Sequence, residues 1–119
     1  MRLFSHQCLV RPNRLLVVYA LSLGLSACSG QSSESLVSQA KQSIAKGDTK
    51  AAVIQLKNAV AADEKNAGAR YELGRLYLDQ AGFASAEKEF RRAREAGYAA
   101  RILNPLIARA LLGQREFQR

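Results

Sequence analysis

Few side chains in this 119-residue sequence could take part in covalent or acid–base chemistry. It contains two cysteines, Cys8 and Cys28, and a single histidine, His6. There is no P-loop, no dinucleotide-binding glycine pattern and no nucleophile elbow. Glu87 and Glu89 are two residues apart in a helical pattern, so their carboxylates face different directions and predict a solvated surface. We therefore predict that the chain is not an enzyme and has no catalytic residues, no metal ligands and no cofactor.

The start of the sequence combines positive charge with an apolar run. Before Glu34 the only charged side chains are Arg2, Arg11 and Arg14. They are followed by Leu15–Leu25, 11 residues without a charge. A basic segment followed by about 7–15 apolar residues is typical of a secretory signal peptide. The run is also shorter than the roughly 20 apolar residues of a spanning helix.

The apolar run ends in Leu25-Ser26-Ala27-Cys28, which resembles the lipobox of bacterial lipoproteins. In that family the cysteine thiol receives fatty-acyl chains such as palmitate, and the signal peptide is cut before the cysteine. The resemblance implies that residues 1–27 are a lipoprotein signal peptide, that Cys28 is lipidated and that residues 28–32 are a polar tether. With serine after the cysteine, it implies an anchor at the periplasmic face of the outer membrane. The residues alone leave an alternative, a buried cysteine at the end of an uncleaved anchor helix.

Beyond the tether, small and large apolar residues recur at fixed spacing. The markers in residues 67–97 are Leu73, Gly74, Tyr77, Ala86, Phe90 and Ala93. One period of 34 residues earlier, the places of Gly74, Ala86, Phe90 and Ala93 hold Ala40, Ala52, Leu56 and Ala59. The small or large character is therefore kept at each place. The combination of motif and period resembles the tetratricopeptide (TPR) repeat, a pair of antiparallel helices.

The resemblance implies an all-α fold, an α-solenoid of TPR-type helix-turn-helix repeats preceded by the signal peptide. Repeats are expected at residues 33–66 and 67–100, and a partial one at 101–119. Small residues let two helices approach where they cross, and large apolar residues fill the space between them. The residues expected to pack the repeats are Ala40, Ala52, Leu56, Ala59, Leu73, Gly74, Tyr77, Ala86, Phe90 and Ala93.

Helical periodicity predicts helices at about residues 33–46, 49–62, 67–80, 83–96 and 103–112. Asp48 and Asn66 are expected to cap the helices that follow them. Gly82 is expected to supply a positive φ between two helices. Pro105 is expected in the first turn of its helix, and Glu116-Phe117 is expected to open another helix.

The last predicted helix, residues 103–112, has no partner helix in the sequence. Helix pairs bury their apolar faces on their neighbours. We therefore expect the protein to continue beyond Arg119, or another chain to cover this helix. The fragment 28–119 is expected to be marginally stable or to self-associate through the same face.

The TPR resemblance also implies where a partner binds. In that family the first helix of each pair lines the concave side of the solenoid. The residues expected in this partner-binding groove are Lys41, Tyr71, Arg75, Leu78 and Asp79. An aromatic anchor beside charged side chains suits a protein or peptide partner. The alternative for these residues is a plain solvated surface.

The one concentrated run of charge is Arg91-Arg92-Ala93-Arg94. Without residues 1–27, 15 basic and 10 acidic residues remain, a net charge of +5. Only Tyr98 lies close enough to serve as an aromatic platform, so nucleic acid is not an expected partner. The run is interpreted as a solvated helix face paired with nearby glutamates. Contact with anionic lipid head groups or an anionic polysaccharide is the alternative.

Together these patterns predict a membrane-anchored scaffold that binds protein partners in the bacterial envelope. Lipobox and repeats look most like the TPR lipoproteins of the exosortase/PEP-CTERM system, which accompany exopolysaccharide and protein sorting. Alternatives are a TPR lipoprotein of pilus assembly or polysaccharide export, and a recruitment module of a longer envelope enzyme. A purely structural spacer is a further alternative.

Overall fold

The computed structural model describes residues 30–119, and every regular element in that range is a helix. The predicted signal peptide, Cys28 and the start of the tether lie outside the described residues. The helices are α2 (Ser33–Ala45), α3 (Thr49–Ala62), α4 (Ala67–Asp79), α5 (Phe83–Glu95) and α6 (Ala100–Phe117). The first four agree with the predicted ranges to within one residue at each end.

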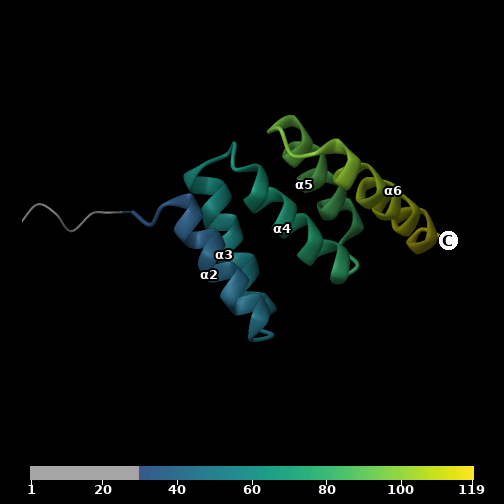
Figure 1. Cartoon of the computed structure of the whole chain (residues 1–119). Helices are drawn as coiled ribbons and strands as arrows, with labels where there is room; N and C mark the ends of the chain where they lie inside the picture. The colour runs from purple at the N-terminus through teal and green to yellow at the C-terminus, as the bar shows by residue number, and fades with distance from the viewer. Residues whose placement is uncertain (1–29) are drawn as a thin grey trace, which may run out of the picture. The chain divides into compact units, whose positions relative to one another are not determined.

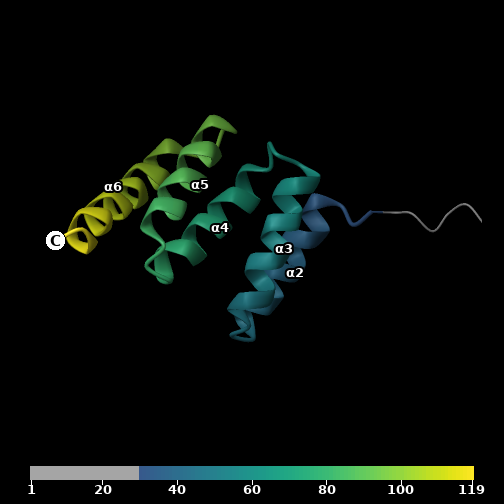
Figure 2. The ribbon, with the colours of Figure 1, turned by 180° about the vertical axis from the view of Figure 1, so that it is seen from behind.

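The helices form two layers. α2, α4 and α6 lie on the side that faces the viewer in Figure 1. α3 and α5 lie on the side that faces the viewer in Figure 2. Consecutive helices run antiparallel, and each packs against the next along the chain. This is the predicted all-α, solenoid-type arrangement of helix pairs.

Side-chain caps begin the first three described helices. Ser32, Asp48 and Asn66 accept hydrogen bonds from the backbone N–H groups three residues ahead, at 3.2, 3.0 and 2.9 Å. Each bond satisfies one of the N–H groups that a helix start leaves without a partner. The caps predicted at Asp48 and Asn66 are thus confirmed.

Two clusters of buried side chains make up the core. The first joins α2, α3 and α4 through Leu36, Ala40, Ala52, Leu56, Ala59, Ala69, Leu73 and Leu76. The second joins α4, α5 and α6 through Leu78, Ala86, Phe90, Ala93, Leu103, Ile107 and Ala110. Half-buried Tyr77 packs against both clusters. Of the ten predicted packing residues, all but Tyr77 are buried.

The crossing of α4 and α5 depends on a residue with no side chain. A Cβ atom at Gly74 would lie 2.7 Å from Cδ1 and Cε1 of Phe90, closer than real Cβ atoms come to a ring. Phe90 is fully buried, so its ring has no free space to move into. The two helices can therefore pack this closely only with glycine at position 74.

α6 differs from the prediction in extent. It is one continuous helix from Ala100 to Phe117, whereas the sequence predicted a helix ending at 112 and another opening at Glu116-Phe117. The apolar stripe does not end at 112, because Gly113 is also buried and a Cβ there would lie 2.6 Å from the ring of Phe83. The glycine is therefore required by close packing and does not end the helix.

Two smaller expectations were also wrong. The positive φ between α4 and α5 belongs to Ala81 (57°), while Gly82 has φ −78° and starts α5. Pro105 lies in the second turn of α6, because the helix begins at Ala100. Its missing N–H leaves the carbonyl of Arg101 without an intrahelical donor. Both residues are exposed, so water can satisfy that carbonyl.

Gly74→Ala should destabilise the fold by about 1–3 kcal/mol, because the added methyl group overlaps the buried Phe90 ring. Gly68→Ala is a matched control on the same helix, where the nearest atom would be 3.4 Å from the new Cβ. It should leave stability unchanged or raise it by up to about 1 kcal/mol. Urea unfolding followed by circular dichroism measures both. Equal stability of the two variants would contradict the close-packing argument.

Candidate partner-binding face

Two tyrosines stack on the side formed by α2, α4 and α6. Tyr71 belongs to α4, and Tyr98 lies in the turn between α5 and α6. Their ring centres are 4.5 Å apart, and the angle between the ring planes is 16°. Tyr71 also lies 6.4 Å from the buried ring of Phe90. Because the core side chain supports the stack from below, both rings are held in place without a partner.

Arg75 extends this aromatic pair toward solvent. It follows Tyr71 by one helical turn, and its guanidinium carbon lies 5.8 Å from the centre of the Tyr71 ring. A cation at this distance is attracted to the ring face by about 0.5–1 kcal/mol at an exposed site. Glu72 lies 3.6 Å from the guanidinium, and the Arg75 side chain remains 52% exposed. The guanidinium is therefore oriented but still open to a partner.

The phenol of Tyr98 is held in its neutral form. Burial is the main cause that raises its pKa above the usual 10.0, with added contributions from Tyr71 and Glu72 and an opposing one from Arg75. A raised pKa means that the folded chain favours the protonated phenol until the pH passes above 10. The phenol would be protonated at neutral pH even without this shift, so the shift only extends the neutral form further into alkaline pH.

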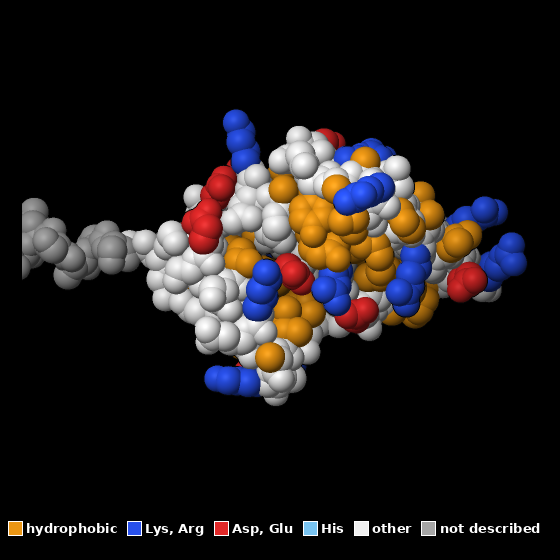
Figure 3. All heavy atoms as spheres, in the orientation of Figure 1, with side chains coloured by type: hydrophobic (Ala, Val, Ile, Leu, Met, Phe, Trp, Pro, Cys, Tyr) orange, Lys and Arg blue, Asp and Glu red, His pale blue; other side chains and the backbone are white. Residues whose placement is uncertain are grey.

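Apolar side chains of α6 continue the surface. Leu106 is half-buried against the second core cluster, and Ile102 is 39% exposed one turn earlier on the same helix. Figure 3 shows hydrophobic side chains gathered over α4 and α6 with Lys and Arg side chains around them. We call Tyr71, Arg75, Tyr98, Ile102 and Leu106 the aromatic–basic face.

The residues predicted to line the partner-binding groove do not all lie in one place. The structure brings Tyr71 and Arg75 together, and it leaves Lys41 on α2 and Asp79 at the end of α4 exposed. Leu78 is a correction: it is only 5% exposed and packs in the second core cluster, so it supports the face and is not available to a partner. Lys41 and Asp79 make no ion pair with another residue in the range 30–119.

Three residues of the aromatic–basic face were not predicted. Tyr98 lies in a turn, outside the helical pattern used to place the groove. Ile102 precedes the predicted start of its helix, and Leu106 lies in the predicted last helix but is not among the expected partner-binding residues. Tyr98 lies between two repeats, and the residue 34 positions earlier is Glu64. This change from a charged to an aromatic residue was the signal in the sequence that could have identified Tyr98.

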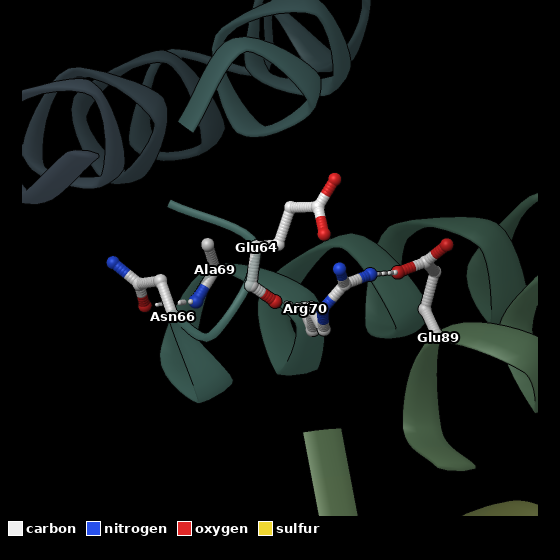
Figure 4. Close-up of polar contacts among 5 residues, drawn as sticks. All are labelled: Glu64, Asn66, Ala69, Arg70 and Glu89. Carbon is white, nitrogen blue, oxygen red and sulfur yellow. Dashed lines mark hydrogen bonds and ion pairs between the residues drawn. The ribbon is translucent and has the colours of Figure 1, made fainter. Parts of the chain in front are cut away.

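A second polar arrangement joins α4 to α5 and to the turn before α4. Arg70 donates from Nε to the carbonyl oxygen of Glu64 at 2.8 Å and from Nη1 to Oε2 of Glu89 at 2.9 Å (Figure 4). The two charged side chains are 6% and 12% exposed. Glu89 is therefore not the solvated residue that the sequence suggested, and this ion pair is part of the interior.

Arg70 of this ion pair also lines a surface hollow. The hollow has a volume of about 680 Å³, and its lining residues are Glu64, Lys65, Arg70, Arg92, Glu95, Ala96 and Gly97. Its charges are mixed, and Arg70 is already engaged by Glu64 and Glu89. We therefore assign Arg70 and Glu89 to structure, which leaves the aromatic–basic face as the candidate site for a partner.

Other kinds of site find little support within residues 30–119. No group of three or more histidine, cysteine, aspartate or glutamate residues there could hold a metal ion. None of the helices in that range is long and apolar enough to cross a membrane.

Glu89→Ala should destabilise the fold by about 3 kcal/mol, because it leaves the buried Arg70 guanidinium without a counter-charge. Glu72→Ala removes the partner of the half-exposed Arg75 and should cost less than about 1 kcal/mol. Thermal and urea unfolding compare the two. Adding Arg70→Leu to the Glu89→Ala variant should recover much of the loss. If it recovers none, the loss does not come from an unpaired charge.

Residues 43–110, which are 68 of the 119 residues, match a family model described as "Tetratricopeptide repeat". No curated protein matches the chain.

Proposed function

Because the chain belongs to the tetratricopeptide repeat family, we propose that it is a scaffold whose aromatic–basic face binds a segment of another protein. Repeats of this family are generally non-catalytic modules for protein–protein interaction. The observation that carries the proposal is the stack of Tyr71 on Tyr98 with the exposed guanidinium of Arg75 beside it. Tyr71 and Arg75 belong to α4, and Tyr98 belongs to the turn between α5 and α6.

The arrangement suits binding for energetic reasons. Tyrosine and arginine are enriched among the residues that contribute most to protein interfaces. The cost of ordering a side chain on binding is lowered here, since Tyr98 and the buried Phe90 already hold the Tyr71 ring. The exposed Ile102 and half-buried Leu106 add apolar area next to the stack. A partner segment with an apolar anchor and an acidic group would complement the face.

We further propose that the scaffold is a lipoprotein of the bacterial envelope, attached through Cys28. The support is the order of basic segment, apolar run and lipobox in the sequence. A position at the periplasmic face of the outer membrane, in a system like exosortase/PEP-CTERM sorting, is the most specific form of this proposal. In that form the lipid restricts the scaffold to the bilayer surface, and the repeats recruit an envelope protein to it.

The partner-binding proposal is tested with Arg75→Glu. Reversing this exposed charge should weaken capture of the partner at least about tenfold, because it removes the cation beside Tyr71. Capture of envelope proteins by the immobilised chain, quantified by mass spectrometry, measures the effect. Lys46→Glu makes the same charge change at the end of α2 and should leave capture unchanged. Equal capture by both variants would favour a structural spacer.

The anchoring proposal is tested with Cys28→Ser. A lipobox serine cannot accept the thioether-linked lipid, so the variant should accumulate as an unprocessed precursor without acyl chains. Metabolic labelling with a fatty-acid analogue and the mass of the N-terminal peptide measure this. Normal processing and membrane partition of the variant would refute the lipoprotein assignment.

A further inference from the structure

Part of α6 exposes apolar side chains that the aromatic–basic face does not include. The helix lies at one end of the stack of described helices and packs mainly on α5 (Figure 1). Leu111 and Leu112 on α6 are 40% and 60% exposed. With 3.6 residues per turn, they point roughly 140° and 120° away from Leu106 around the helix axis. The two leucines therefore belong to a surface separate from the aromatic–basic face.

A hollow lies beside the two leucines. It has a volume of about 550 Å³, and we call it the α6 groove, with the lining residues Ala108, Leu111, Leu112, Gln114, Arg115 and Gln118. Five of the six belong to α6, and Gln118 directly follows it, so the hollow lies between side chains of a single helix. A small molecule would stay largely uncovered in such a groove. A row of side chains on another helix fits it better, because helices pack by placing the ridges of one into the grooves of the other.

The charges on α6 are mostly positive. The helix carries Arg101, Arg109 and Arg115 against Glu116, three positive side chains against one negative, or +2. All four side chains are exposed, and none of them forms an ion pair with another residue in the range 30–119. Arg115 lines the α6 groove together with Leu112. The exposed leucines are thus accompanied by cations that the described part of the fold does not neutralise.

We propose that the α6 groove docks an amphipathic helix of another protein, one whose apolar stripe is flanked by acidic residues. Leu111 and Leu112 would pack against the apolar stripe, and the arginines of α6 would pair with the acidic residues. A second copy of this chain complements the groove less well, because a contact between two α6 helices would bring the same arginines together. The proposal does not depend on the function proposed above, which concerns the aromatic–basic face.

The test uses the full chain and two synthetic peptides, each about 18 residues long, that differ only in charge. The first has leucines at positions i, i+3, i+4 and i+7 of a helix with glutamates on either side. The second has lysine in place of every glutamate. Fluorescence anisotropy measures the binding of each labelled peptide. The acidic peptide should bind at least about tenfold more tightly than the basic one, and added salt should reduce the difference.

Variants matched in exposure locate the peptide on the molecule. Leu112→Gln and Leu111→Gln should each weaken binding of the acidic peptide at least about fivefold. Ile54→Gln on α3 and Ile102→Gln on the aromatic–basic face are the controls, because these isoleucines are 60% and 39% exposed. Neither control should change the affinity. Arg115→Glu should weaken binding of the acidic peptide and strengthen binding of the basic one.

Three results would overturn the proposal. The first is equal binding of the two peptides, or no binding of the acidic one. The second is an equal or larger loss in the controls, which for Ile102→Gln would move the peptide to the aromatic–basic face. The third is a dimer of the full chain, seen by sedimentation, that Leu112→Gln dissociates, because the occupant of the α6 groove would then be a second copy.

Discussion

The contact of Phe90 with Gly74 sets the spacing on which the rest of the fold depends. It fixes how closely α5 lies on α4, because a side chain at position 74 would occupy the place of the ring. The same ring supports Tyr71 from within, so the aromatic–basic face and the core meet at one residue. On the far side of α5, Gly113 lets α6 approach Phe83 in a similar way. Glycines at two helix crossings thus position the aromatic–basic face.

Polar contacts join the repeats at their turns. Ser33 is buried, donates to the carbonyl oxygen of Ala59 at 2.9 Å and accepts from the side chain of Asn66 at 2.8 Å. Asn66 also caps α4, so Ser33 and Asn66 together link the start of α2, the last turn of α3 and the start of α4. Arg70 continues this connection to α5 through Glu89. No buried side-chain nitrogen or oxygen in the described range lacks a hydrogen-bond partner.

The sequence was sufficient for what is periodic. The extents of the first four helices, the Asp48 and Asn66 caps and the buried small residues follow from a 34-residue repeat and local capping chemistry. What it missed depends on contacts between distant residues. From the sequence alone, Gly113 suggests the end of a helix. In the fold it lies against the ring of Phe83, and α6 continues past it. Glu89 reads as solvated until Arg70, 19 residues earlier, is found to face it. Tyr98 belongs to the aromatic–basic face only because the turn that contains it folds back onto Tyr71.

The position of Tyr77 between the two core clusters has a consequence for how the unit unfolds. Its ring packs against side chains of both clusters, and α4 supplies residues to each. Loss of either cluster therefore exposes part of the other, which makes the two repeats a single cooperative unit rather than two independent ones. In the language of repeat-protein energetics, Tyr77 contributes to the nearest-neighbour coupling, and the chain should melt as a whole rather than fray from one end.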